Sequence, residues 1–238
     1  MASANFAENE RRVMLLGNTG SGKSRLAQSI AGSNADNYFY DGLKTSVVKQ
    51  RSCSRFGHYL NVIDTPGYKQ KDDKSFEKDL DVYVENSNSS PHVFLICLPV
   101  GRCTEEINEM LDEYVRFFGK NILGFTIFVF THIDQWNDDM EELGCSIDFT
   151  QYIDSLPKHI KLFNSDSRYC QINNRLTGAE NENQIKQLVD KIEDLVTLNR
   201  NASFEKYDEP FIVKTVKWAT QKVYKKSCEF FKSISGNQ

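Results

Sequence analysis

Residues 17–24 read Gly-Asn-Thr-Gly-Ser-Gly-Lys-Ser, and this stretch restricts the possible folds more than any other part of the chain. It follows the apolar run Val13–Leu16 and precedes a helix-like segment, Arg25–Ala31. A strand, a glycine-rich turn and a helix in this order form a phosphate-binding loop. Glycine tolerates positive φ, so backbone N–H groups in the turn are free to point at phosphate oxygens, and the helix N-terminus adds partial positive charge. The stretch therefore predicts binding of a nucleoside phosphate.

Two side chains of this loop have distinct expected roles. Lys23 is expected to reach the β- and γ-phosphates, and the Ser24 hydroxyl to ligate Mg²⁺. The alternative, a chance glycine-rich turn with a surface lysine, is disfavoured by the complete pattern in its strand-to-helix context. The candidate nucleotide contacts are consecutive in the chain: Asn18, Thr19, Gly20, Ser21, Gly22, Lys23, Ser24 and Arg25.

The composition is that of a globular protein. Hydrophobic residues make up 39% of the 238 residues and charged residues 26%, so a full core is available. The formal net charge of −4 gives no reason to expect a nucleic-acid partner. Residues 211–238 differ from this average, because they carry six lysines against one glutamate.

The cysteines favour a reducing compartment. The six cysteines are scattered without a C-x-x-C pair, and Cys97 and Cys170 fall within apolar runs, where a thiol packs as a small hydrophobic group. The sequence lacks a signal peptide, an apolar run of bilayer length and a lipidation motif. A cytoplasmic protein is expected.

Strand-like and helix-like segments alternate along the chain. This rhythm predicts an α/β fold with a mostly parallel central sheet and helices on both faces. The expected strands are 11–17, 45–54, 58–64, 92–98, 125–130 and 168–172. The expected helices are 22–32, a segment ending near Val84, 104–118, 152–162 and 180–198. We expect a flexible N-terminus at 1–10, a nucleotide-binding domain at 11–207 and a C-terminal extension at 208–238, with a boundary at Tyr207–Pro210.

A second motif, Asp64-Thr65-Pro66-Gly67, lies at the end of an apolar strand about 40 residues after the glycine-rich loop. An aspartate at this place holds Mg²⁺ through water, and the Gly67 N–H meets a γ-phosphate. Thr45, nineteen positions earlier, is the candidate for a mobile threonine that joins Mg²⁺ when the γ-phosphate is present. Ser46 and a purely structural strand-edge hydroxyl are the alternatives. The catalytic candidates here are Thr45 and Gly67, and the metal candidates are Ser24, Thr45 and Asp64.

A third motif, Thr131-His132-Ile133-Asp134, follows the apolar run 125–130. A carboxylate here accepts two hydrogen bonds from guanine, whereas adenine would place an acceptor against the buried charge. Asp134 is therefore predicted to select guanine, and His132 to lie against the base. A surface turn is the usual setting of an isolated His-x-Asp, but the order and spacing of the three motifs favour the base-recognition interpretation.

With these motifs the chain resembles the GIMAP/IAN family of immunity-associated GTPases. Two further segments carry the resemblance: PHVFLICLPVGRCTEE at 91–106 and RYCQINNRLTGAE at 168–180. The resemblance covers about residues 11–198 and implies a Ras-like P-loop GTPase core that binds GTP and GDP with Mg²⁺. It also implies that Asn173 contacts the guanine, with Asn174 beside it. The chain departs from many relatives at residues 27–30, where Ala-Gln-Ser-Ile replaces a Gly-Asn-Ser-Ile pattern.

Hydrolysis is expected to be slow in a monomer. Many small GTPases place a water-orienting glutamine directly after this motif, where the present chain has Tyr68. Arg102 is the candidate for catalysis in trans, because its guanidinium would neutralise charge on the γ-phosphoryl group across a dimer. Alternatively, Arg102 caps the strand end or pairs with Glu105 or Glu106.

The C-terminal extension has the pattern of an amphipathic helix. Apolar residues from Val213 to Ile234 recur at spacings of three and four, with lysines on the remaining face. Such a helix packs on its own domain, lies on an anionic membrane surface as a peripheral contact, or pairs with another protomer.

The sequence thus predicts a GTP/GDP-binding switch that hydrolyses GTP slowly and forms a homodimer or oligomer in the GTP state. The alternative is a GTP-binding oligomeric scaffold with negligible hydrolysis. A small-molecule kinase is disfavoured because it has no use for residues 131–134. An interaction module that has lost nucleotide binding is disfavoured because Lys23, Ser24 and Asp64 are all present.

Overall fold

The first strand of the chain, β1 (Glu10–Gly17), lies inside the sheet with both of its faces covered. Successive side chains of a strand point to opposite faces, so Val13 and Leu15 pack on one face and Met14 and Leu16 on the other. All four are fully buried. This explains why the sequence before the glycine-rich loop is continuously apolar instead of alternating.

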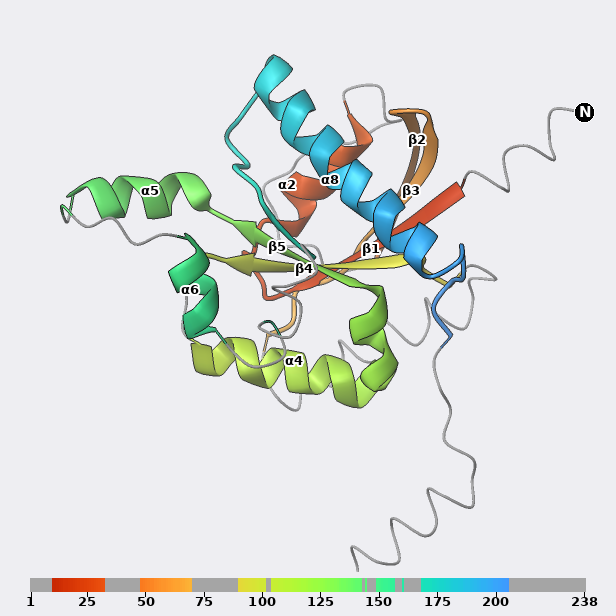
Figure 1. The fold of residues 1–238 in the computed structure, drawn as a ribbon, viewed down its shortest axis with the longest axis horizontal. Helices are drawn as coiled ribbons and strands as arrows, with labels where there is room; N and C mark the ends of the chain where they lie inside the picture. The colour runs from red at the N-terminus through yellow and green to blue at the C-terminus, as the bar shows by residue number, and fades with distance from the viewer. Residues whose placement is uncertain are drawn as a thin grey trace, which may run out of the picture. The chain divides into compact units, whose positions relative to one another are not determined.

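The computed structural model describes residues 10–32, 48–69, 90–101, 104–142, 144, 149–156, 160 and 168–205. Within them the six-stranded sheet has the order β2-β3-β1-β4-β5-β6 (Figure 1). Only the pair of β2 and β3 is antiparallel. The remaining strands are β2 (Lys49–Arg55), β3 (His58–Asp64), β4 (Val93–Pro99), β5 (Thr126–Thr131) and β6 (Tyr169–Gln171).

Helices cover both faces of this sheet (Figure 1). On one face, α2 and α8 pack together over the layer that contains Val13 and Leu15. On the other, α4 and α6 pack with Met14 and Leu16 in a core rich in aromatic rings. The helices in the described residues are α2 (Lys23–Ala31), α4 (Thr104–Phe118), η1 (Lys120–Phe125), α5 (Ile133–Glu142), α6 (Phe149–Ser155) and α8 (Gly178–Leu198).

The predicted α/β architecture with a mostly parallel sheet is confirmed. Most of the expected elements occur within a few residues of their predicted bounds. The helix expected at 152–162 is instead α6, which begins at Phe149, and α5 and η1 were not expected. The sequence gives a weak signal for α5 because its one buried residue is Ile133. Residues 1–9, the segment ending near Val84 and the extension at 208–238 lie outside the described residues.

The parallel strands bring their carboxyl ends to one edge of the sheet. In the strand register, Leu15 pairs with Asp64, Gly17 with Cys97, and Pro99 with Thr131. Loops that follow these strands therefore start side by side, although they are far apart in sequence. This is the edge at which ligands bind in open α/β sheets.

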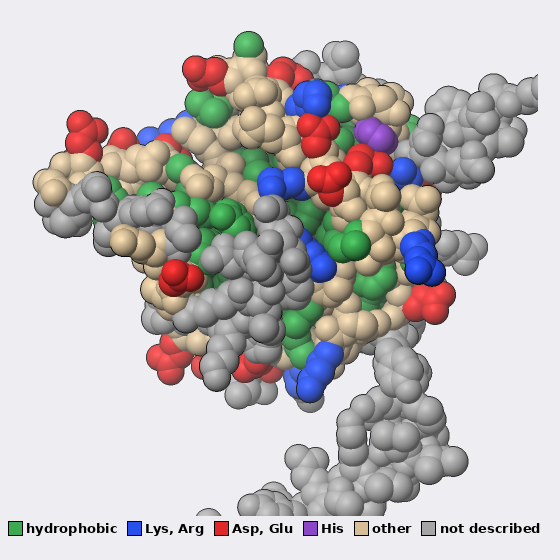
Figure 2. Space-filling view, in the orientation of Figure 1, with side chains coloured by type: hydrophobic (Ala, Val, Ile, Leu, Met, Phe, Trp, Pro, Cys, Tyr) green, Lys and Arg blue, Asp and Glu red, His purple; other side chains and the backbone are tan. Residues whose placement is uncertain are grey.

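Charged side chains of both signs lie on the surface, and the cysteines that the structure describes are free thiols. Basic and acidic side chains are interspersed over the face shown in Figure 2. Cys53, Cys97 and Cys170 are free thiols, and burial raises the pKa of Cys97 to about 12.

None of the helices in the described ranges combines the length and the apolar character needed to cross a membrane.

A buried histidine lies at the opposite, amino edge of the sheet. Nδ1 of His92 accepts a hydrogen bond from the Arg12 backbone N–H at 3.0 Å, and the ring faces the Arg12 guanidinium. Burial, followed by the charges of Arg12 and Arg11, lowers the pKa of His92 to about 4. The ring is therefore neutral at pH 7.

We expect this histidine to make folding sensitive to mild acid. An unfolded histidine titrates near pH 6.5, so the stability that the neutral ring contributes is complete above that pH and is lost as the pH falls toward 4. The loss should be about 2 kcal/mol, since partial solvation reduces the full effect. Urea unfolding of wild type and His92→Asn from pH 7 to pH 4 measures it. The variant keeps an acceptor but does not titrate, so an equal pH slope in both proteins would contradict the assignment.

Candidate functional site

The glycine-rich loop connects β1 to α2 at the carboxyl edge of the sheet. The three glycines expected to adopt positive φ do so, with values of 145° at Gly17, 80° at Gly20 and 82° at Gly22. Close packing adds a second requirement. A Cβ atom on Gly17 would lie 2.5 Å from the Cys97 carbonyl oxygen, and one on Gly22 would lie 2.5 Å from Nδ2 of Asn174. Both positions therefore favour glycine for conformation, and Gly17 also requires it for space, because the Cys97 backbone cannot move aside as the Asn174 side chain can.

The side chain of Lys23 lies within this loop. Its Nζ donates to the carbonyl oxygens of Gly17 at 3.0 Å and Asn18 at 2.9 Å. The residue is 5% exposed, and burial lowers the pKa of Lys23, while the charge of Asp64 opposes that shift. A positive charge is thus held close to the loop backbone.

The N-terminus of α2 opens at the same loop. Its cap residue, Gly22, makes no side-chain capping bond, and the first amides of any helix lack intrahelical acceptors. These amides suit the oxygens of a phosphate. Ser24 lies half-buried in the first turn, and the exposed Arg25 donates from Nε to the Asn174 carbonyl oxygen at 3.2 Å.

The loop after β3 is hydrogen-bonded directly to the glycine-rich loop. The Tyr68 N–H donates to the Gly17 carbonyl, and the Thr19 N–H donates to the Tyr68 carbonyl, each at 3.0 Å. A Cβ atom on Gly67 would lie 2.5 Å from the Cα and Oγ1 of Thr19. Asp64, at the end of β3, is 1% exposed and near enough to Lys23 to affect its pKa. The structure therefore brings the first two motifs together.

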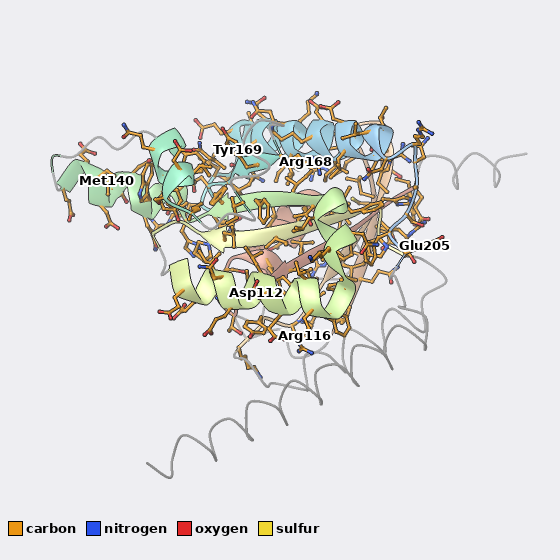
Figure 3. The ribbon with its side chains drawn as sticks, turned by 60° about the horizontal axis from the view of Figure 1, so that its bottom comes forward. Asp112, Arg116, Met140, Arg168, Tyr169 and Glu205 are labelled. Carbon is orange, nitrogen blue, oxygen red and sulfur yellow. The ribbon has the colours of Figure 1, made fainter. Side chains whose placement is uncertain are left out.

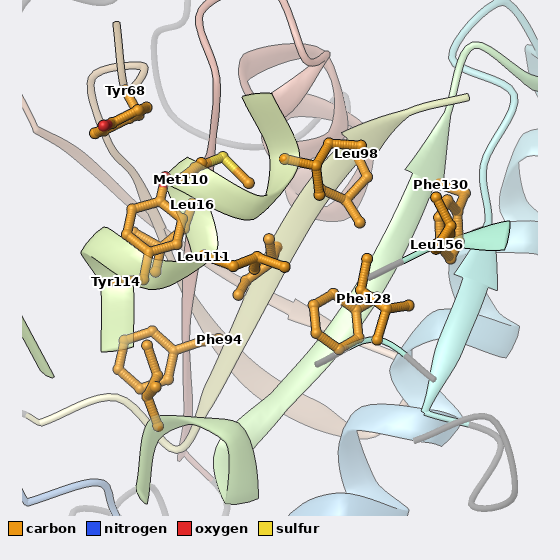
Figure 4. Packing of buried hydrophobic residues seen from close by; sticks show 14 of the residues in the cluster. Leu16, Tyr68, Phe94, Leu98, Met110, Leu111, Tyr114, Phe128, Phe130 and Leu156 are labelled. Carbon is orange, nitrogen blue, oxygen red and sulfur yellow. The ribbon is translucent and has the colours of Figure 1, made fainter. Parts of the chain in front are cut away.

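Two tyrosines connect these loops to α4. The Tyr114 hydroxyl accepts a hydrogen bond from the Gly17 N–H at 2.8 Å. The Tyr68 ring packs edge-on against Tyr114, with 6.2 Å between centroids, and is 7% exposed (Figure 4). Sequence reasoning missed Tyr114, because its position in α4 fits an ordinary core residue.

The third motif joins the loop from the β5 side. Thr131 donates from Oγ1 to the Ser21 carbonyl oxygen at 2.9 Å. His132 has a φ of 60°, uncommon for a side chain other than glycine, and its Nδ1 lies 3.1 Å from Thr131 Oγ1. Asp134 follows in the first turn of α5, and its carboxylate lies 2.8 Å from Nε of Arg175. Neither Thr131 nor Arg175 was among the predicted contacts.

The two adjacent asparagines after β6 have different surroundings. Asn174 Nδ2 donates to the Gly22 carbonyl oxygen at 3.4 Å, and its buried Oδ1 makes no hydrogen bond within the described residues. Asn173 instead closes its own turn, because its Oδ1 accepts the Arg175 N–H at 2.8 Å. Asn174 is thus the asparagine that contacts the glycine-rich loop directly. Thr45, Ser46 and Arg102 lie outside the described residues.

These groups have the chemistry that a nucleoside phosphate with Mg²⁺ requires. The backbone amides in the first turn of α2 and the Lys23 ammonium suit phosphate oxygens. The Ser24 hydroxyl and the Asp64 carboxylate are oxygen ligands of the kind that Mg²⁺ prefers. Asp134 and the buried Asn174 Oδ1 provide acceptors beside the loop. The residues present therefore fit both groups.

A parallel sheet with a phosphate-binding loop after its first strand, joined to loops with Asp64 and Asp134, defines a P-loop G domain. The chain belongs to the AIG1 family, whose model matches residues 11–222. The predicted GIMAP/IAN membership is thereby confirmed.

Curated relatives carry the names of this family. GTPase IMAP family member 8 from Rattus norvegicus is 28% identical over 201 residues, covering 82% of this chain and 28% of that protein. Immune-associated nucleotide-binding protein 9 from Arabidopsis thaliana is 26% identical over 243 residues, covering 99% of this chain and 69% of that protein. The chain thus spans less than a third of the first relative's length and about two thirds of the second's.

Solved structures share the fold. Toc33 from Arabidopsis thaliana in complex with GDP and Mg²⁺ has a TM-score of 0.59 at 19% identity, covering 85% of this chain and 92% of that chain. A second match, at 22% identity and a TM-score of 0.59, covers 84% of this chain and 90% of that one, and concerns atToc33 and psToc159, for whose GTPase activity dimerization is important. The predicted Ras-like fold is confirmed, and the predicted guanine nucleotide with Mg²⁺ agrees with the ligands of Toc33.

Tyr114→Phe should loosen the glycine-rich loop. Without the hydroxyl, the buried Gly17 N–H lacks an acceptor, which costs about 1–3 kcal/mol. We expect a lower free energy of unfolding by urea and weaker GDP binding by calorimetry. Tyr152→Phe is the matched control, since that hydroxyl accepts the Gly101 N–H at 3.2 Å. Unchanged GDP affinity in Tyr114→Phe, or an equal loss in the control, would argue against the role of Tyr114.

Proposed function

We propose that this chain binds GTP and GDP with Mg²⁺ and acts as a nucleotide-dependent switch. One observation supports this most: the buried Lys23 ammonium lies in a loop that is hydrogen-bonded to Tyr68 after β3, to Thr131 at the end of β5 and to Asn174 after β6. A phosphate in that loop would be in reach of groups from three separate segments. A change in the phosphate would therefore affect them together.

In this proposal each predicted residue keeps the role that its chemistry suggests. Lys23 and the backbone amides at the N-terminus of α2 hold the phosphates, while Ser24, Asp64 and Thr45 ligate Mg²⁺ directly or through water. Asp134 accepts the guanine N–H groups, Asn173 contacts the guanine with Asn174 beside it, and His132 lies against the base. When bound, Mg²⁺ neutralises phosphate charge. Gly67 approaches the γ-phosphate from the loop that contacts Thr19.

In this proposal an isolated monomer hydrolyses GTP slowly. The Tyr68 ring packs against Tyr114 in the core and is 7% exposed, so it is unsuited to orienting a water molecule. Arg102 from a second protomer is the candidate group for stabilising charge on the transferred phosphoryl group. The role of dimerization in atToc33 and psToc159 makes a dimer a reasonable expectation. The alternative is a GTP-binding oligomeric scaffold with negligible hydrolysis.

The proposal also assigns a domain organisation and a cellular location. Residues 11–207 would form the G domain, and the basic extension at 208–238 would pack on it, on a protomer or on an anionic membrane. A protein of this kind would act in the cytoplasm or on the cytosolic face of a membrane.

Lys23→Ala should weaken GDP binding about 10- to 100-fold, because charge-assisted hydrogen bonds to phosphate are lost. Lys186→Ala is the control: Lys186 pairs with Asp190 on the surface of α8 and should leave GDP affinity unchanged. Calorimetry with GDP and ADP measures affinity and base selectivity together. Equal affinity of wild type for GDP and ADP would contradict a guanine-specific site.

The rate of GTP hydrolysis per protein molecule should rise with protein concentration and become flat in Arg102→Ala. An arginine acting in trans contributes about 10³–10⁵ in rate. Steady-state phosphate release over a wide concentration range tests this. No turnover at any concentration, with GTP still bound, would favour the scaffold. A substantial rate that is independent of concentration would place the catalytic group within the monomer.

A further inference from the structure

The side chain of Arg175 reaches from the turn after β6 to the aspartate that we assign to guanine recognition. Its Nε lies 2.8 Å from Oδ2 of Asp134. The side chain of Asp134 is 14% exposed, whereas that of Arg175 is 63% exposed. The arginine thus balances the charge of a carboxylate that is mostly withdrawn from water, while remaining free on its outer side.

The backbone of Arg175 is fixed, so movement is left to its side chain. Its N–H donates to Oδ1 of Asn173 at 2.8 Å. Asn173 is held by α8, because Gln184 accepts from its N–H at 3.1 Å and donates to its carbonyl oxygen at 2.9 Å. A long side chain on a rigid turn can swing toward solvent without disturbing the neighbouring Asn174.

Arginine and guanine present similar donors to a carboxylate. The guanidinium group carries N–H donors in a planar fork, and the base-pairing edge of guanine carries a ring N–H beside an amine N–H. We propose that Arg175 is a stand-in for guanine, which pairs with Asp134 while the base is absent and is displaced when the base binds. The inference rests on the proposed guanine recognition by Asp134 and adds a regulatory residue to that site.

Displacement of Arg175 by guanine affects both the affinity for the nucleotide and its release. Guanine must break the ion pair between Arg175 and Asp134 to reach the carboxylate, so the arginine lowers the net affinity for the nucleotide. It also pairs again with Asp134 as the base leaves, which favours nucleotide release and keeps the empty site from holding an unpaired buried charge. Arg175 therefore adjusts nucleotide exchange.

The test is calorimetric titration of GDP, with Mg²⁺, into nucleotide-free full-length protein. Arg175→Ala should bind GDP about fivefold more tightly, the factor that a partly buried ion pair of ordinary strength contributes. The unfolding temperature of the nucleotide-free variant should fall, and its rise on adding GDP should be larger than in wild type. Loss of a positive charge near phosphates would by itself weaken binding, so tighter binding has the opposite sign to a general electrostatic effect.

Arg116→Ala is the matched control. Arg116 lies on α4 (Figure 3) and pairs with Glu113. The side chain of Arg116 is 60% exposed and that of Glu113 is 15% exposed, close to the values for Arg175 and Asp134. It should leave GDP affinity unchanged. In an Asp134→Ala background, Arg175→Ala should bring no gain, because the partner of the arginine is gone.

These measurements separate the role of Arg175 from guanine recognition by Asp134. Unchanged or weaker GDP binding by Arg175→Ala, in a protein that still prefers GDP to ADP, overturns the role of Arg175 and leaves guanine binding intact. A gain that persists without Asp134 also overturns it. A wild-type protein without preference for GDP overturns the proposed function, and the role of Arg175 with it.

Discussion

The peptide groups of Gly17 are shared among three parts of the molecule. The N–H donates to the Tyr114 hydroxyl from α4, and the carbonyl oxygen accepts both the Tyr68 N–H and the Lys23 ammonium. These bonds hold the start of the glycine-rich loop against the helix layer, the loop after β3 and the Lys23 ammonium at once. A residue with a side chain would meet the Cys97 carbonyl oxygen, so the arrangement depends on glycine.

Close packing at this point determines how a signal from the phosphate would spread. Gly67 and Thr19 leave no space for a methyl group between their loops, and Tyr68 continues the contact into the core beside Tyr114. Movement of the loop after β3 therefore has to change the packing against α4. In sequence, Arg102, the residue proposed to act across a dimer, comes just before this helix.

The base side of the site is held by polar bonds instead of packing. Thr131 and Asn174 each bond to a carbonyl of the glycine-rich loop, and Asp134 is paired with Arg175. Polar partners can be exchanged for a ligand's donors at small net cost, whereas packed rings cannot. The site thus combines a rigidly packed side with a side of exchangeable polar contacts, which suits the proposed binding and release of a nucleotide.

The sequence by itself determined the alternation of the strands with most of the helices, the glycine-rich loop and the identity of Lys23, Ser24, Asp64 and Asp134 as candidates. These features can be read from short segments, because a strand buried on both faces requires a continuous apolar run and the turn requires glycines that adopt positive φ. The family resemblance implied that Asn173 contacts the guanine, with Asn174 beside it. Only the tertiary structure decided that Asn174 bonds to Gly22, that Tyr114 holds Gly17, and that Arg175 pairs with Asp134. The partners in these pairs are 152, 97 and 41 positions apart, so their meeting depends on sheet order and helix packing, which no local pattern contains.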